Sequence, residues 1–203
     1  MAADEFAENV DDNAFTNAVA KEALLNYNKA ARRLGLHENP HFEEIATKIA
    51  FYKLENNVTS EYRNYDGRTI KQADVNLLAF PLKTITDPNQ IRRDLEYYKE
   101  RIGSGTPAMT EAIFTILYCR LGDPDKAYDS FINSFRLNVW GPFEGFTESK
   151  LGMTPYFITG AGGVLQSVIY GFGGIDITDE GITQLPPVLP KQWKSITIKG
   201  FTS

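Results

Sequence analysis

Two glutamates, Glu5 and Glu148, are the residues of this chain whose setting best suits acid–base chemistry. Each lies in an aromatic stretch of low charge, "ADEF" and "PFEGFTES", that is flanked by turn-forming residues. Burial against aromatic rings raises the pKa of a carboxyl group, as a general acid requires. Two such groups, one protonated and one ionised, are what the hydrolysis of a glycosidic bond needs. The alternative is that both belong among the ordinary solvated acids, since the chain has 26 Asp and Glu.

Other chemistry has weaker support in the sequence. His37 and His41 lie in the polar stretch "LHENPHF" without a cysteine or acidic partner at a metal-ligand spacing, so we expect a surface loop and no metal. The single cysteine, Cys119, excludes an internal disulfide and is expected to be a small buried apolar residue. The glycine-rich stretches 103–107 and 160–163 lack the Lys-Ser/Thr of a phosphate loop. We therefore expect no cofactor.

The composition describes an ordinary globular protein. Of 203 residues, 42% are hydrophobic and 12% aromatic, which favours a packed core over disorder. The net charge of −5, with scattered Lys and Arg, disfavours nucleic acid and anionic membrane surfaces as partners. The sequence contains neither a run of about 18 apolar residues nor a basic signal-peptide start. We expect a soluble protein, and the sequence indicates no compartment.

The elements that must position these residues are mostly helical. Apolar spacing predicts helices over 14–34 and 42–53. The polar composition of 56–67 predicts a loop, and a helical pattern then resumes over 69–82, where Pro81 ends it. Helix-start signatures follow at Asp87-Pro88, with Gln90 reaching back, at Thr106-Pro107 and at Asp123-Pro124. The chain is thus predicted to run from helix to helix.

Two of these helices differ in how they are covered. The helix over 109–121 is apolar on nearly every side and should be surrounded by protein, whereas the next one is apolar on one face only. This alternation predicts a double layer of helices. A short glycine-rich helix then precedes "IDITDEGITQ" and "WKSITIKGF", whose alternating pattern predicts β-strands.

Several ordered blocks resemble glycoside hydrolase family 65. "DEFAENVDDNAFTN" at 4–17 is similar to the general-acid segment of that family, and "KQADVNLLAFPL" at 71–82 is similar to its sugar-binding Lys-Gln segment. "GTPAMTEAIFTILYCRLGD", "PFEGFTES" and "YFITGAGGVLQSVIYGFGGI" resemble, in the same order, later blocks of its hydrolytic members, the acid trehalase-like and kojibiose hydrolase-like α-glucosidases. The resemblance covers nearly the whole chain.

The resemblance assigns roles to four residues. Glu5 is implied to be the general acid and Glu148 the general base, while Lys71 and Gln72 are implied to hydrogen-bond the hydroxyl groups of glucose. The implied reaction is the inverting hydrolysis of an α-glucoside disaccharide or oligosaccharide such as trehalose or kojibiose. Inversion needs the two carboxyl groups roughly 6.5 to 9.5 Å apart.

A disaccharide phosphorylase is an alternative within the same family. Its phosphorylases place a histidine and serines ahead of the buried helix to hold phosphate, whereas this chain reads "GSGTPAMT" there and carries Glu148. Hydrolysis is therefore preferred. Phe146 stands where the family usually has tryptophan, which is a departure inside the general-base block.

The resemblance also implies a fold and a domain organisation. We expect a mainly α fold, the second half of an (α/α)6 barrel over 1–174, and the start of a C-terminal β-sheet segment over 175–203. Family members are several times longer, so a second hypothesis is a catalytically inactive, truncated helical module that forms homo-oligomers through its open barrel face, or that pairs with a missing N-terminal part. A helical-repeat scaffold is disfavoured because no internal period of about 34 residues is visible.

Overall fold

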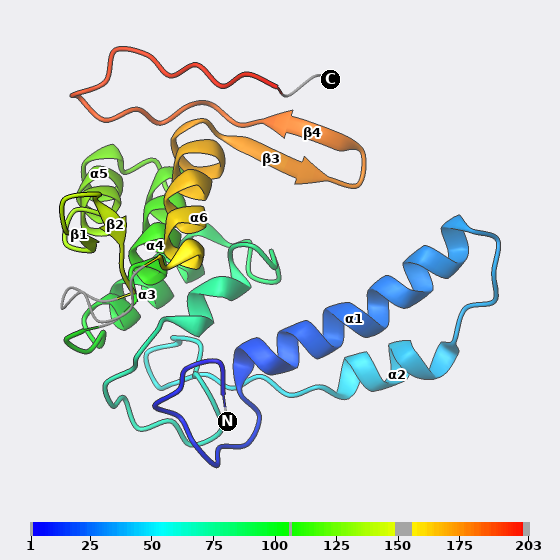
Figure 1. Cartoon of the computed structure of the whole chain (residues 1–203). Helices are drawn as coiled ribbons and strands as arrows, with labels where there is room; N and C mark the ends of the chain where they lie inside the picture. The colour runs from blue at the N-terminus through cyan, green and yellow to red at the C-terminus, as the bar shows by residue number, and fades with distance from the viewer. Residues whose placement is uncertain (1, 106, 149–155, 201–203) are drawn as a thin grey trace. The chain divides into compact units, whose positions relative to one another are not determined.

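A computed structural model describes residues 2–105, 107–148 and 156–200 (Figure 1). The chain divides into two compact units, Met1–Ile102 and Gly103–Ser203. Helices make up most of the regular structure in both units, as the apolar periodicity predicts. The division at 174/175 that the sequence suggested stays a prediction.

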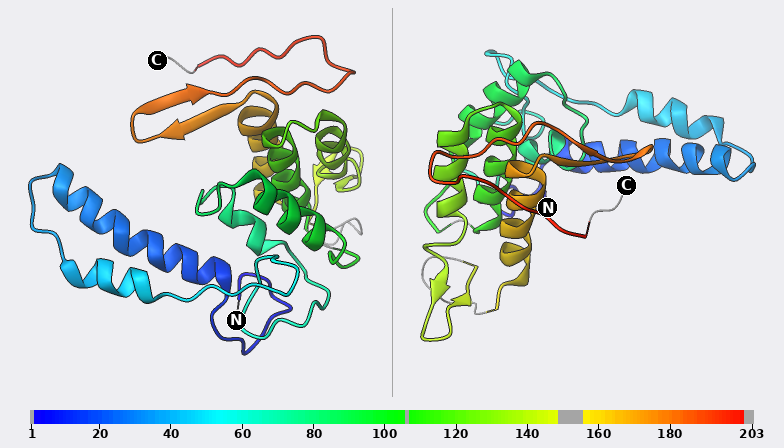
Figure 2. Two further views of the ribbon diagram at one scale, coloured as in Figure 1. Left: turned by 180° about the vertical axis from the view of Figure 1, so that it is seen from behind. Right: turned by 90° about the horizontal axis from the view of Figure 1, so that it is seen from above.

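The first unit begins with a helical hairpin. Helix α1 (Ala14–Arg33) starts after Asn13, whose side chain accepts a hydrogen bond from the Thr16 N–H at 2.9 Å. Helix α2 (Pro40–Lys48) returns along α1, and both further views show the two side by side (Figure 2). Asn28 of α1 binds both backbone groups of Asn39, at 2.8 and 2.9 Å, which fixes the hairpin. Helix α1 confirms the expected helix over 14–34.

The second expected helix is shorter than its pattern suggested. It was predicted to run to residue 53, but α2 ends at Lys48 because Ile49 adopts an extended conformation with ψ 122°. Residues 56–67 form a loop without helix or strand, as expected. The loop is closed by backbone pairing between Lys53 and Thr59.

The segment 69–82 contradicts the prediction of a helix. Its regular part is the short 3-10 helix η1 (Asp74–Leu78). Ile70 instead pairs with Ile102 as an isolated β-bridge, and the N–H groups of Lys71 and Gln72 donate to a side chain rather than to helical carbonyls. The backbone at Lys71 and Gln72 therefore bends outside any helix, where distant residues bind it.

Helix α3 (Pro88–Lys99) closes the first unit. The carboxylate of Asp87 accepts from the N–H groups of Asn89 and Gln90 at 3.1 and 3.3 Å, which confirms the predicted cap. The Gln90 side chain does not reach back to the cap, because it donates to Asp94 at 2.7 Å. Leu95 is fully buried, so the inner face of α3 belongs to the core.

The second unit is built around helix α4 (Met109–Arg120). Its side chains are buried on nearly every side, as predicted. Helix α5 (Pro124–Asn133) packs against it and is capped by Asp123, which accepts from Lys126 N–H at 3.1 Å. The start predicted at Thr106-Pro107 is not confirmed: Thr106 lies outside the described residues, and α4 begins at Met109 without a side-chain cap.

The remainder of the second unit combines one long helix with short hairpins. Helix α6 (Ile158–Gln166) continues as the π-helix η2 (Ser167–Phe172) against α4. Strands β1 (Val139–Trp140) and β2 (Gly145–Phe146) form one antiparallel hairpin, and β3 (Ile175–Thr178) and β4 (Gly181–Gln184) form another. The latter confirms the strands expected in "IDITDEGITQ".

The strand expected in "WKSITIKGF" is absent from its described part, residues 193–200. This segment is anchored by packing instead of by a ladder. The Trp193 ring contacts Phe172 and Phe131, with ring centroids 4.7 and 5.6 Å apart. Alternation of apolar and polar residues alone is therefore insufficient to predict a strand here. The described residues of this segment pair with no neighbouring strand.

Candidate active site

The predicted general acid and the predicted sugar-binding pair lie together in the first unit. The Lys71 ammonium donates to the Glu5 carboxylate, and the Gln72 side-chain amide donates to the Ala3 carbonyl. These contacts join residues that are 66 and 69 positions apart in the sequence. The fold thus brings three of the four predicted site residues to one place.

The expected burial of Glu5 against aromatic rings is wrong. Its side chain is 54% exposed, and the neighbouring Phe6 is equally exposed. The buried member of the acidic pair is Asp4, which is 1% exposed. Two adjacent acids therefore occupy opposite environments, with Glu5 facing solvent and Lys71.

Asp4 organises the turn that carries Glu5. Its Oδ1 atom accepts from the N–H groups of Lys71 at 2.7 Å, Gln72 at 3.2 Å and Phe6 at 3.4 Å. The Asp4 carbonyl accepts from Ala7 N–H at 3.0 Å. One carboxylate thus binds the turn to the extended segment opposite it.

A buried polar cluster lies behind this turn. Asn13 donates through its side chain to Asp74 at 2.9 Å and to the Glu61 carbonyl at 3.2 Å. Glu61 and Asp74 are each 1% exposed, and neither carboxyl oxygen of Glu61 has a hydrogen-bond partner among the described residues. Such burial without partners is costly for an ionised carboxylate.

Burial and the neighbouring acids therefore favour protonated carboxyl groups in the cluster. Burial, with the negative charges of Asp74 and Asp4, raises the pKa of Glu61 to about 9. Burial raises the pKa of Asp74 to about 7, against the hydrogen bond from Asn13, which lowers it. At neutral pH, Glu61 is neutral in the folded protein.

Glu148, the predicted general base, belongs to the second unit. It is half-buried and follows the β1–β2 hairpin. Its carbonyl accepts from the Asn138 side chain at 3.0 Å and from Ala108 N–H at 3.3 Å. Asn138 also binds Thr147, accepting from its N–H at 2.7 Å. The backbone at Glu148 is therefore held from two sides, while its spacing to Glu5 stays a prediction.

Phe146 is packed tightly against the start of α6. A Cβ atom added at Gly160 would come within 2.5 Å of the Phe146 ring and 3.0 Å of the Phe157 ring. The Phe146 carbonyl also accepts from Phe157 N–H at 2.8 Å. The absence of a side chain at Gly160 therefore allows the β1–β2 hairpin before Glu148 to pack against α6.

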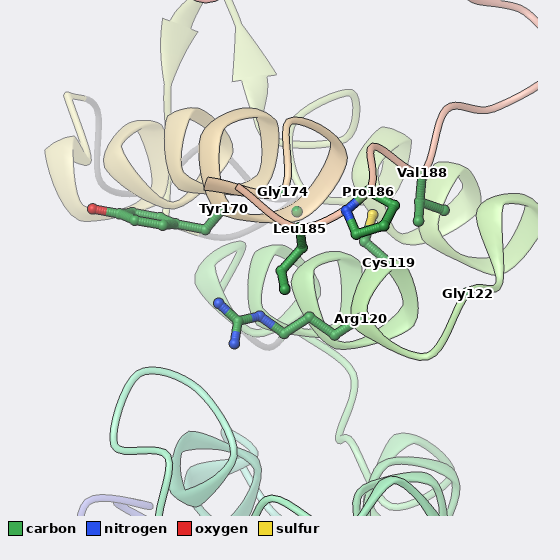
Figure 3. A pocket seen from close by; sticks show the side chains of 9 residues that line it. Cys119, Arg120, Gly122, Tyr170, Gly174, Leu185, Pro186 and Val188 are labelled. Carbon is green, nitrogen blue, oxygen red and sulfur yellow. The ribbon is translucent and has the colours of Figure 1, made fainter. Parts of the chain in front are cut away.

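A separate cavity of about 250 Å³ lies in the second unit (Figure 3). It is bounded by α4, η2 and the segment at Leu185 and Pro186, and its lining is mainly apolar. Burial raises the pKa of Cys119, which lines it, to about 12, so this thiol is a poor nucleophile. Cys119 is buried, as expected from the sequence. The polar side chains of the cavity lining are those of Tyr170 and of Arg120, whose guanidinium donates to Asp176 at 3.1 Å.

Among the described residues, the acidic residues, the histidines and the cysteine are the candidate metal ligands, and the helices are the candidate membrane spans. No group of three His, Cys, Asp or Glu in this part of the chain could hold a metal ion. His37 and His41 are exposed, although His41 lies in the first turn of α2 and contacts Glu44 instead of lying in a loop. Among the described residues, no helix is both long and apolar enough to cross a membrane.

The sequence analysis missed the polar residues that support the site. Asp4 and Glu61 matter because they are buried, and the residues next to them in the sequence do not reveal that burial. A signal was nevertheless present, since Glu61 and Asp74 each interrupt stretches that are otherwise tyrosine-rich or apolar, "SEYRNY" and "ADVNLL". A charged residue in such a stretch is either solvated at a turn or held in the core by partners.

The structure shows a mainly helical fold, and comparison with known proteins identifies the family. Residues 40–154 match the profile of the glycosyl hydrolase family 65 central catalytic domain. The chain therefore belongs to glycoside hydrolase family 65.

Two curated relatives and one solved structure extend this assignment. The chain is 54% identical over 201 residues to the kojibiose hydrolase of Mucilaginibacter mallensis, and 52% identical over 203 residues to that of Flavobacterium johnsoniae. These alignments cover 98% and 99% of this chain but 30% of each relative. The chain thus spans about 30% of the length of the curated relatives that it matches.

The solved structure named "Putative kojibiose phosphorylase from human microbiome" superposes with a TM-score of 0.73 at 17% identity. The superposition covers 95% of this chain and 32% of that one. At this identity the likeness shows the fold alone. It confirms the mainly helical fold class expected for part of an (α/α)6 barrel.

Proposed function

We propose that this chain carries catalytic residues of an inverting α-glucosidase that hydrolyses kojibiose- or trehalose-like α-glucosides. Glu5 is the general acid that protonates the leaving oxygen, and Glu148 is the general base that activates water. Lys71 and Gln72 bind the hydroxyl groups of the glucose to be released. The names of the two kojibiose hydrolases support this substrate class.

The observation that carries the proposal is the contact between Glu5 and Lys71. A proton donor and a hydroxyl-binding cation must both reach the same glucose unit, so they must lie within one sugar ring of each other. Glucose hydroxyl groups that accept from Lys71 would compete with Glu5 for the same ammonium group.

The test is glucose release from kojibiose and trehalose by the wild-type chain and by Glu5→Gln. Removal of a general acid lowers the rate about 10²- to 10⁴-fold. α-Glucosyl fluoride separates this role from binding, because fluoride leaves without protonation; Glu5→Gln should therefore retain much more activity on the fluoride than on the disaccharides. Glu8→Gln, an exposed acid in the same segment, is the matched control. Disaccharide hydrolysis at the wild-type rate by Glu5→Gln would contradict the assignment.

A second candidate is the inactive helical module that associates with itself. The α1–α2 hairpin supports it, because large apolar side chains there are exposed: Val19, Tyr27, Leu34, Leu36 and Ile45. Where such side chains form one contiguous patch, the patch commonly marks an interaction site. Light scattering on the same samples distinguishes the two candidates, since stable dimers that release no glucose would favour the module.

A further inference from the structure

Asp4 stands out in the first unit because it is a fully buried acidic residue whose carboxylate accepts from three backbone N–H groups. Its Oδ1 atom binds Lys71 N–H at 2.7 Å and Gln72 N–H at 3.2 Å, the two residues implied to hold glucose. Its own neighbour in the chain is the proposed proton donor, Glu5. The same side chain therefore touches both halves of the proposed site through the backbone.

We propose that Asp4 is a positioning residue whose carboxylate fixes the Glu5 turn against the Lys71-Gln72 segment and so sets the spacing between proton donor and glucose. This inference rests on the proposed function. It assigns Asp4 no contact with substrate, because the residue is 1% exposed.

The surroundings of Asp4 support an anchoring role over proton transfer. Oδ1 accepts from three backbone N–H groups, two on the Lys71-Gln72 segment and one on the Glu5 turn. The acids that face it, Glu61 and Asp74, are equally buried and have raised pKa values. The Asp4 carboxylate is therefore held in place by oriented backbone amides on both sides of the contact.

The direct test on the wild-type chain is nuclear magnetic resonance of the Lys71 amide. A long-range HNCO experiment should detect coupling from the Lys71 nitrogen to the Asp4 carboxyl carbon. In Asp4→Ala, amide exchange at Lys71 and Gln72 should accelerate at least about tenfold, since a lost charge-assisted hydrogen bond changes an equilibrium by that factor or more. Asp4→Asn keeps an acceptor oxygen and should recover part of the protection.

Kinetics and binding separate positioning from general stability. Asn28→Ala removes a buried double hydrogen bond of the α1–α2 hairpin and serves as the destabilised control in the same unit. Asp4→Ala should weaken glucose binding and raise KM about tenfold or more, with partial rescue in Asp4→Asn, whereas Asn28→Ala should leave KM unchanged.

Each outcome decides one claim. No Lys71–Asp4 coupling in the wild type, or unchanged amide exchange in Asp4→Ala, would overturn the proposal. Equal KM values in Asp4→Ala and Asn28→Ala would also overturn it. A wild-type chain that shows the coupling but neither binds glucose nor releases it would contradict the proposed function while leaving the Asp4 tether intact.

Discussion

The adjacent acids Asp4 and Glu5 show that two carboxyl groups next to each other in the sequence can lie in different environments and have different roles. Asp4 is buried among backbone N–H donors, and Glu5 is half exposed beside Lys71. A sequence pattern that contains both acids identifies the pair, but it does not tell which acid is the proton donor and which one positions it. The division follows from burial, because a fully enclosed carboxylate cannot reach a substrate.

Glu61 predicts an unusual pH dependence of stability. Burial and the charges of Asp74 and Asp4 raise its pKa to about 9, against a weaker lowering effect of Arg68. Between pH 5 and 8 the folded protein keeps a proton that the unfolded chain releases, so the free energy of unfolding falls as pH rises. Glu61→Gln should remove the part of this fall that Glu61 causes, up to about 4 kcal/mol over the three pH units, and leave the smaller part that Asp74 causes below its pKa of about 7.

Urea unfolding followed by circular dichroism at pH 5 and pH 8 measures this effect. Glu55→Gln, an exposed acid in the nearby loop, should keep the wild-type pH dependence. The exposed acids with lowered pKa values, such as Glu38 and Asp66, contribute with the opposite sign, but only at lower pH. A Glu61→Gln protein that loses stability toward pH 8 as steeply as the wild type would show that Glu61 is not the neutral group.

At the scale of elements, local signals predicted most helices and failed where distant contacts decide. The caps at Asp87 and Asp123 are set by residues within one turn, so the sequence reveals them. The non-helical backbone at Lys71 is bound by Asp4, 67 positions away, and no local pattern encodes that bond. The same limit explains why Lys71 could be matched to Glu5 only through family resemblance.

Helix α6 allows a test of how the hairpin before Glu148 is supported. Gly160→Ala places a methyl group where the Phe146 ring now lies, so the ring must move and the adjacent Thr147-Glu148 backbone with it. We expect shifted resonances at Phe146 and Thr147 and slower glucose release. Gly162→Ala is the matched control, because no atom lies within 4 Å of its added Cβ.

The two glycine variants should differ in stability as well. Gly162→Ala should stabilise the helix by roughly 0.5 to 1 kcal/mol, since alanine has the higher helix propensity. Gly160→Ala should lack this gain because of the clash. Identical spectra and rates for both variants would mean that the packing of Phe146 on α6 does not support the general base.

At the scale of the whole molecule, family membership and fold agree with what the ordered motifs suggested. The match over residues 40–154 and the TM-score of 0.73 both concern long stretches, which is why several weak blocks in order predicted more than any single residue. Glu5 and Glu148 belong to different units, and their pairing stays a prediction. The stereochemistry of the reaction reports on that pairing.

The most direct measurement is the anomeric form of newly released glucose, followed by proton nuclear magnetic resonance during the first minutes of kojibiose hydrolysis. A general acid and a water-activating base on opposite faces of the sugar predict an excess of β-glucose over the equilibrium mixture, which then decays by mutarotation. An excess of α-glucose would indicate retention and contradict Glu148 as a water-activating base, and the absence of glucose release would contradict hydrolysis by this chain.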